Sequence, residues 1–202
     1  NIIKKEIIDL NKGNSQNQET EGNLTLLVLG GSQAAKIFAE ILPNIFKECK
    51  NKGIYIKILQ QCLPNQKEEL SLFYKNENID FETFHFSNEL QSYFLKTDFA
   101  ITRAGSSILA ELTNCNLPFI AIPLPSSADN HQLKNANFYK NKKLAFILEE
   151  KDLENKLFYI IEKIYKNKSV LTEIKKNQRQ YSDKNVYNNV SIFLNNLTDE
   201  KN

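Results

Sequence analysis

The chain has 202 residues but neither methionine nor tryptophan. Position 1 is Asn1, so we expect a processed protein or, as we favour, a piece that begins within a longer one. Long apolar runs are also missing, since none approaches the roughly 20 residues of a membrane-spanning helix. No secretory signal peptide opens the sequence. These absences predict a soluble piece of a larger protein.

A strong excess of one charge is absent as well. The 26 Lys and Arg residues oppose 24 Asp and Glu residues, a net charge of +2, so we expect no nucleic-acid partner. No Asp-x-Asp metal-binding pair occurs, and we expect neither a metal nor a cofactor. The cysteines are odd in number and lack CxxC spacing, which favours a reduced cytosolic protein: Cys49, Cys62 and Cys115.

Short apolar runs alternate with segments of helical spacing. Expected strands are residues 24–29, 54–59, 79–84, 99–102, 119–122 and 145–148. Expected helices are residues 34–49, 65–74, 87–95, 106–113, 130–139, 152–166, 169–181 and 186–197, with Asp152 as an N-cap. Such alternation predicts an α/β fold, a Rossmann-like parallel sheet with helices on both faces. We divide the chain into a lead-in and mobile linker (1–23), a nucleotide-binding domain (24–168) and C-terminal helices (169–202).

Two strand-to-helix turns have the character of phosphate sites. Residues 30–33 read GGSQ, where two glycines allow close backbone approach and the next helix offers free N–H groups. They match neither GxGxxG nor GxxxxGK[ST], which argues against NAD and P-loop sites. Residues 103–107 read RAGSS, another helix start with hydroxyl donors. Glu111, one and a half turns later, is placed to accept hydrogen bonds from ribose hydroxyls.

Two further segments carry candidate ligand groups. Residues 129–136 read DNHQLKNA, and helical spacing puts the side chains of His131, Gln132 and Asn135 near one another. An amide-rich surface helix explains the same pattern without a ligand. Phe86, Ser87 and Leu90 flank the third expected strand, where apolar side chains belong either to the core or to a base pocket.

Together these segments resemble the MurG family of bacterial glycosyltransferases, which add N-acetylglucosamine (GlcNAc) to lipid I. The resemblance covers roughly residues 1–197 and rests on GGSQ, on RAGxxxxxE at 103–111 and on DNHQLKNA, which matches the family's DxHQxxNA. Ala34 replaces a family glycine, and Ser106 to Ile108 replace Ala-Leu-Thr. Residues 1–7 resemble the interdomain segment, with Lys4 in place of an arginine near the phosphates.

The resemblance implies the C-terminal half of a two-domain GT-B glycosyltransferase, with UDP-GlcNAc on this half. Residues implied to contact that donor are Ser32, Gln33, Phe86, Ser87, Arg103, Gly105, Ser106, Ser107, Glu111, His131, Gln132 and Asn135, with Lys4, Gly31 and Leu90 as further candidates. Glu111 would hold the ribose, Ser87 the uracil edge and Gln132 the sugar hydroxyls.

The implied reaction is an inverting transfer, in which the 4-hydroxyl of lipid I attacks the anomeric carbon and UDP departs. By the same resemblance the general base and the lipid I site lie on the N-terminal domain, so we expect no catalytic residue in this chain. The resemblance also implies peripheral attachment at the cytoplasmic face of the plasma membrane.

Other functions remain open on the sequence. One is another UDP-sugar enzyme of the same fold, such as a UDP-GlcNAc 2-epimerase, which an acceptor assay would separate. The second is a non-catalytic UDP-sugar-binding subunit that needs a separate membrane-anchored partner, which the mass of the native gene product would reveal. A dehydrogenase is disfavoured because the glycine fingerprint for NAD is missing.

Overall fold

A computed structural model describes residues 23–85 and 90–181 of the chain. The expected linker, the expected helix at 186–197 and the candidates Lys4, Phe86 and Ser87 lie outside these residues. Side chains of residues 32–35, which include Ser32 and Gln33, are likewise outside the description. No helix within the described ranges is both long and apolar enough to cross a membrane.

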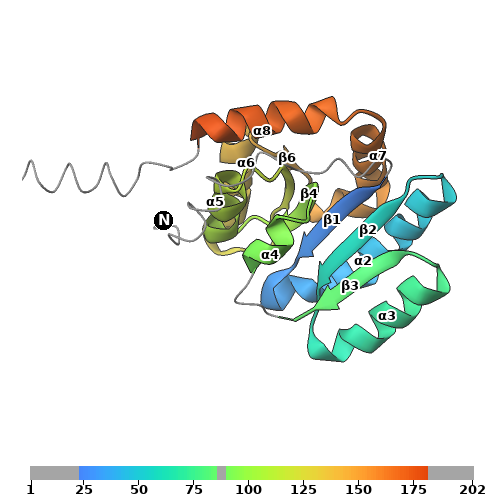
Figure 1. The fold of residues 1–202 in the computed structure, drawn as a ribbon. Helices are drawn as coiled ribbons and strands as arrows, with labels where there is room; N and C mark the ends of the chain where they lie inside the picture. Colours follow the sequence, from blue (N-terminus) through green and yellow to red (C-terminus); the bar gives the residue numbers. More distant parts are fainter. Residues whose placement is uncertain (1–22, 86–89, 182–202) are drawn as a thin grey trace, which may run out of the picture.

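Six parallel strands form one sheet, in the order β3-β2-β1-β4-β5-β6 (Figure 1). The strands are β1 (Leu24–Leu29), β2 (Ile56–Gln61), β3 (Asp80–Phe84), β4 (Phe99–Arg103), β5 (Phe119–Ile122) and β6 (Phe146–Ile147). Their short apolar runs are almost wholly buried in β1, β4 and β5, as expected for strands that helices cover on both faces. The predicted Rossmann-like fold class is confirmed.

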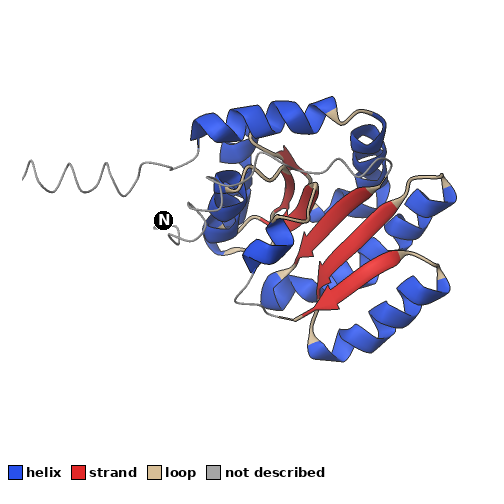
Figure 2. Cartoon of the chain, viewed as in Figure 1, coloured by secondary structure: helices blue, strands red, loops and turns tan. Residues whose placement is uncertain are grey.

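Helices cover both faces of this sheet (Figure 2). They are α2 (Gly31–Asn51), α3 (Lys67–Asn76), α4 (Leu90–Phe94), α5 (Ser106–Asn114), α6 (His131–Asn141), α7 (Leu153–Lys166) and α8 (Ser169–Tyr181), with 3-10 turns η1 (Pro64–Gln66), η2 (Ala128–Asn130) and η3 (Glu150–Asp152). Successive strand residues point to opposite faces, so Leu26 and Val28 pack in one core with α2, α3 and α7. Leu27 and Leu29 pack in the other with α4, α5 and α6.

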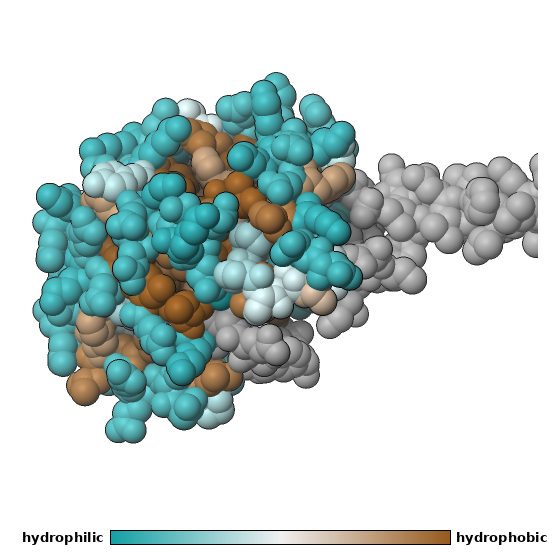
Figure 3. All heavy atoms as spheres, turned by 180° about the vertical axis from the view of Figure 1, so that it is seen from behind, coloured by the Kyte–Doolittle hydropathy of each residue, from teal (hydrophilic) through white to brown (hydrophobic). Residues whose placement is uncertain are grey.

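The surface is mainly polar. Figure 3 shows one face on which hydrophilic side chains predominate and apolar ones appear in separate patches. Helix α8 covers part of the apolar core, because its Leu171 packs with core residues of α2 and α7. Its buried Gln178 donates from Nε2 to the carbonyl oxygens of Leu117 and Leu144, at 3.1 and 2.9 Å. The helix therefore packs as part of this domain.

The strand order places a switch point at the centre of the sheet. From β1 the chain builds β2 and β3 on one side, then passes through α4 to β4 on the other. β1 and β4 are neighbours, with Leu29 paired to Thr102 near their carboxyl ends. The connection after β1 therefore runs to one side of the sheet and the connection after β4 to the other. Open α/β sheets bind ligands in the crevice between two such connections. Both glycine-containing turns predicted from sequence begin at this crevice.

Local details shift some predicted boundaries. Strand β2 begins two residues later than expected because Ile54 belongs to the end of α2, where its N–H bonds to Cys49 O and Gly53 has a φ of 74°. Helix α2 begins at Gly31 and ends at Asn51, so it extends beyond the expected 34–49 at both ends. Asp152 is the N-cap of α7, but its side chain makes no capping bond and pairs with Lys156 at 3.1 Å. The preceding turn η3 gives the cap residue a helical conformation.

Cys49 gives this core a pH dependence. Burial, with nearby Glu48, raises the pKa of its thiol from 9.0 to about 12. The folded protein keeps the thiol proton where the unfolded chain releases it, so this contribution to stability is complete below pH 9 and lost toward pH 12. We expect the stability difference between the wild type and Cys49→Ala to narrow by up to about 1.4 kcal/mol per pH unit in that window. Urea unfolding at pH 8, 10 and 11 measures it, and a constant difference would contradict the assignment.

Candidate functional site

The turn between β4 and α5 is open to solvent at the switch point. Gly105 is the N-cap of α5, with φ −68° and ψ 138°, a conformation that any residue can adopt. An added Cβ there would meet only Ile108 Cγ2, at 3.8 Å. Neither strain nor packing therefore requires glycine, and the space beside it is free for a ligand. Exposed Ser106 and Ser107 follow, so two hydroxyls stand at a helix start, where the first backbone N–H groups have no partner within the helix.

Glu111 continues this exposed face of α5. It follows Ser107 by four residues, which puts both side chains on one line along the helix. The opposite side of α5 is buried through Leu109 and Leu112. Glu111 is half-buried. Burial of the Cys115 thiol, with the nearby Glu111 carboxylate, raises the pKa of that thiol to about 12. An anion-receptive helix start with a carboxylate one and a half turns away suits a nucleoside diphosphate.

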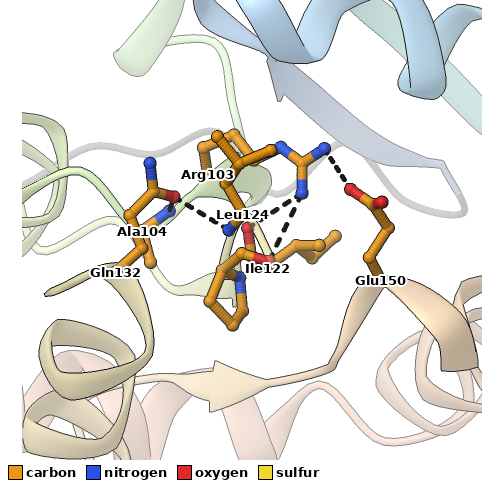
Figure 4. A network of polar contacts seen from close by, with 7 residues as sticks. Arg103, Ala104, Ile122, Leu124, Gln132 and Glu150 are labelled. Atoms are coloured by element: carbon orange, nitrogen blue, oxygen red, sulfur yellow. Dashed lines mark hydrogen bonds and ion pairs between the residues drawn. The ribbon is translucent and has the colours of Figure 1, made fainter. Parts of the chain in front are cut away.

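Two side-chain amides of α6, those of Gln132 and Asn135, hold the same turn by hydrogen bonds, an arrangement called the clip below. Gln132 Oε1 accepts hydrogen bonds from the N–H groups of Ala104, at 3.2 Å, and Leu124, at 3.0 Å (Figure 4). Asn135 Nδ2 donates to Ala104 O at 3.0 Å. Both polar atoms of Ala104 are thus held by one helix. Since both partners of Gln132 are donors, its oxygen must face them, and its amide nitrogen points away from them in Figure 4.

The start of α6 is fixed by two left-handed residues. Asp129 and Asn130 have φ values of 50° and 53°, which these residue types tolerate better than most. Asn130 N donates to Ser127 O at 3.0 Å. The exposed His131 places Nδ1 2.8 Å from Ala128 O. A carbonyl only accepts, so Nδ1 is the donor in this contact.

The loop after β1 approaches the crevice from the other side. Gly31 is exposed with a φ of 63°, so this position favours glycine. No atom lies within 4 Å of an added Cβ at this position. Its N–H bonds to Gln61 Oε1 at 3.2 Å, which ties the loop to the end of β2.

Leu90, the first residue of α4, packs against the core of α4 and α5.

Arg103 is the candidate whose surroundings differ most from the expectation. It is only 7% exposed. Its guanidinium pairs with Glu150 at the start of η3 (Figure 4). Sequence reasoning missed Glu150 and Leu124 as members of this region. No sequence signal marks either one. Glu150 meets Arg103 from a distant part of the chain, and Leu124 contributes only a backbone N–H, which nearly every residue has.

Within the described ranges, no three His, Cys, Asp or Glu side chains are grouped so as to hold a metal ion. A groove of about 230 Å³ lies between α6, α8 and the start of β6, lined by Lys140, Phe146 and Ile174 among others. It adjoins the amino end of β6 and so lies at the edge of the sheet opposite the switch point.

The glycosyltransferase family 28 C-terminal domain matches residues 25–190. The chain belongs to this family. It is 38% identical over 176 residues to the UDP-N-acetylglucosamine--N-acetylmuramyl-(pentapeptide) pyrophosphoryl-undecaprenol N-acetylglucosamine transferase of Pelagibacter ubique, covering 85% of this chain and 48% of that protein. The enzyme of the same name from Rickettsia bellii is 32% identical over 179 residues, covering 87% and 50%. The chain thus spans about half the length of these relatives, and the resemblance to the MurG family is confirmed.

Solved structures agree on the fold. A crystal structure of MurG from Acinetobacter baumannii superposes with a TM-score of 0.70 at 24% identity, covering 87% of this chain and 49% of that one. WaaG, a glycosyltransferase involved in lipopolysaccharide biosynthesis, gives 0.55 at 15% identity, covering 88% and 46%. At these identities the likeness shows the fold alone, that of one half of a GT-B glycosyltransferase.

Proposed function

We propose that this chain is the donor-binding half of a glycosyltransferase that moves GlcNAc from UDP-GlcNAc to lipid I and so forms lipid II. The observation that carries the proposal is the β4–α5 turn, clipped by Gln132 and Asn135 and open beside Gly105. It stands at the switch point, where this fold binds nucleotides. The names of the relatives support the choice of sugar and acceptor.

Each part of the donor has candidate contacts on this half. The helix start of α5, with Ser106 and Ser107, would receive the diphosphate, and Glu111 would accept hydrogen bonds from the ribose hydroxyls. His131 and the amide nitrogen of Gln132 would face the GlcNAc, beside the clip. Uracil would lie near Phe86, Ser87 and Leu90. The loop of Gly31, Ser32 and Gln33 would approach the diphosphate from the opposite side of the crevice, and Lys4 of the interdomain segment would add a further contact to it.

The reaction would be an inverting displacement at the anomeric carbon. A general base on the N-terminal half would remove the proton from the lipid I 4-hydroxyl. Negative charge then develops on the departing UDP, and fixed N–H groups at the α5 start are oriented to stabilise it. In this proposal the chain supplies donor binding and leaving-group stabilisation, and the other half supplies lipid I and contact with the cytoplasmic face of the plasma membrane.

Titration of this chain with UDP and UDP-GlcNAc, followed by calorimetry, tests the proposal. We expect weak binding of both ligands and no transfer of GlcNAc to a lipid I analogue, because the proposed base lies on the other half. The full-length protein should perform the transfer in the same assay. Failure of the chain to bind UDP would remove the donor-binding role. Transfer by the chain alone would show that it holds the whole catalytic machinery.

A further inference from the structure

Arg103 is a charged side chain enclosed at the carboxyl end of β4. Its Nη1 lies 3.4 Å from Ile122 O and 3.5 Å from Pro123 O, both at the end of β5. Its Nη2 donates to Glu150 Oε2. The guanidinium also stacks over the ring of Phe38, with 4.8 Å from Cζ to the ring centroid. One cation therefore joins the ends of two strands to η3 and α2.

Arg103, the last residue of β4, and Ala104, the residue after it, hold the turn from opposite faces of the sheet. Ala104 packs into the core beneath α5 and α6, and α6 clips its backbone. Arg103 points to the other face, where Phe38 of α2 belongs to the core shared with α7. Helix α2 begins at the Gly31 loop, so Arg103 links the two turns that meet at the switch point. Removal of the Arg103 side chain would remove the contacts on one face of the β4–α5 turn and leave the hydrogen bonds from Gln132 and Asn135 in place.

Stability alone is a poor reason for such an arrangement. A buried ion pair often adds no more to stability than apolar side chains of similar volume would. The guanidinium is also incompletely satisfied, since Nε is buried with no hydrogen-bond partner among the described residues. Its planar fork nevertheless gives fixed directions to several partners at once, which an apolar side chain cannot do.

We propose that Arg103 is a positioning residue for diphosphate binding, acting through the β4–α5 turn and α2 and touching no ligand itself. This role rests on the proposed function. Glu150 is its necessary partner, because the carboxylate orients the guanidinium and balances its charge. The direct ligand contact expected for Arg103 from the sequence is replaced in this proposal by an indirect one.

Calorimetric titration with UDP and with uridine compares this chain with Arg103→Met, Glu150→Gln and their double variant. Arg103→Met should bind UDP about tenfold more weakly, about 1.4 kcal/mol, because the turn loses its support on one face. Uridine affinity should stay within about twofold, since uridine lacks the diphosphate. The double variant should be no weaker than Arg103→Met, because both changes remove one interaction.

The sign of the Glu150→Gln effect separates positioning from direct contact. If Arg103 touched the diphosphate, removing the neighbouring negative charge would strengthen UDP binding. Positioning predicts weaker binding, because the guanidinium loses the group that orients it. This variant also decides the question if Arg103→Met fails to fold. Tyr74→Phe is the control, since it removes a buried hydrogen bond to Gln60 on β2 and should leave UDP affinity within about twofold.

Three results would overturn this role while the proposed function stands. They are unchanged UDP affinity in Arg103→Met, equal losses for UDP and uridine, and tighter UDP binding in Glu150→Gln. If the unaltered chain binds no UDP, the proposed function fails and this role fails with it.

Discussion

Glu111→Ala is expected to weaken UDP binding by about 1–3 kcal/mol, the range for losing a charged hydrogen-bond partner. The carboxylate stands on the exposed line of α5 that begins at Ser107. In the proposed site it accepts hydrogen bonds from both ribose hydroxyls, and without it those hydroxyls face a gap. Calorimetric titration of this chain with UDP measures the loss. Glu173→Ala, at the groove beside α8, is the matched control and should bind UDP as the wild type does.

A double-mutant cycle tests whether the affinity lost in Glu111→Ala comes from the contact with the ribose. UDP that lacks the 2′- and 3′-hydroxyls should bind the wild type weakly and lose little more in Glu111→Ala, because both changes remove one interaction. Losses that add would mean that Glu111 does not hold the ribose. The unaltered fold of the variant can be checked by its unfolding midpoint, since Glu111 lies outside both cores.

The fold was largely predictable from the pattern of apolar residues. Runs such as residues 24–29 and 119–122 are too short for helices. They are apolar at nearly every position, whereas a strand with one face in water alternates apolar and polar residues, so the runs predict strands buried in a parallel sheet. Helix ends were harder to place. The beginning of β2 depends on a backbone bond from Ile54 to Cys49. Helix α2 extends beyond its expected bounds of 34–49 by a few residues at each end, from Gly31 to Asn51.

The site was predictable only in part. Helical periodicity correctly put Gln132 and Asn135 on one face, but it could not show that this face meets Ala104, about 30 residues earlier in the chain. A sequence also gives no measure of burial for a polar residue at a strand end. Arg103 therefore has the pattern of a ligand contact, while its packing against Phe38 and Glu150 depends on the tertiary structure.

Because Gln132 accepts hydrogen bonds from the β4–α5 turn and from Leu124, a substitution there should change stability as well as sugar recognition. Gln132→Ala leaves the N–H groups of Ala104 and Leu124 without their acceptor. A buried donor left unpaired costs about 1–3 kcal/mol, and half-buried Leu124 can regain water, so we expect a loss of about 2 kcal/mol in the free energy of unfolding. Urea unfolding measures it. UDP binding should weaken as well, because the turn that receives the diphosphate loses part of its support.

Gln132→Glu separates this supporting role from sugar selection. The carboxylate keeps an oxygen for the two backbone N–H groups, so stability should stay close to that of the wild type. It removes the amide N–H₂, the only donor with which this side chain can recognise a sugar hydroxyl. A site that hydrogen-bonds a hydroxyl rejects the wrong epimer by leaving polar groups unpaired. In the full-length protein, Gln132→Glu should therefore lower the preference for UDP-GlcNAc over UDP-GalNAc, measured as the ratio of their kcat/KM values. An unchanged ratio in this well-folded variant would limit Gln132 to holding the turn, and sugar selection would then belong to other residues.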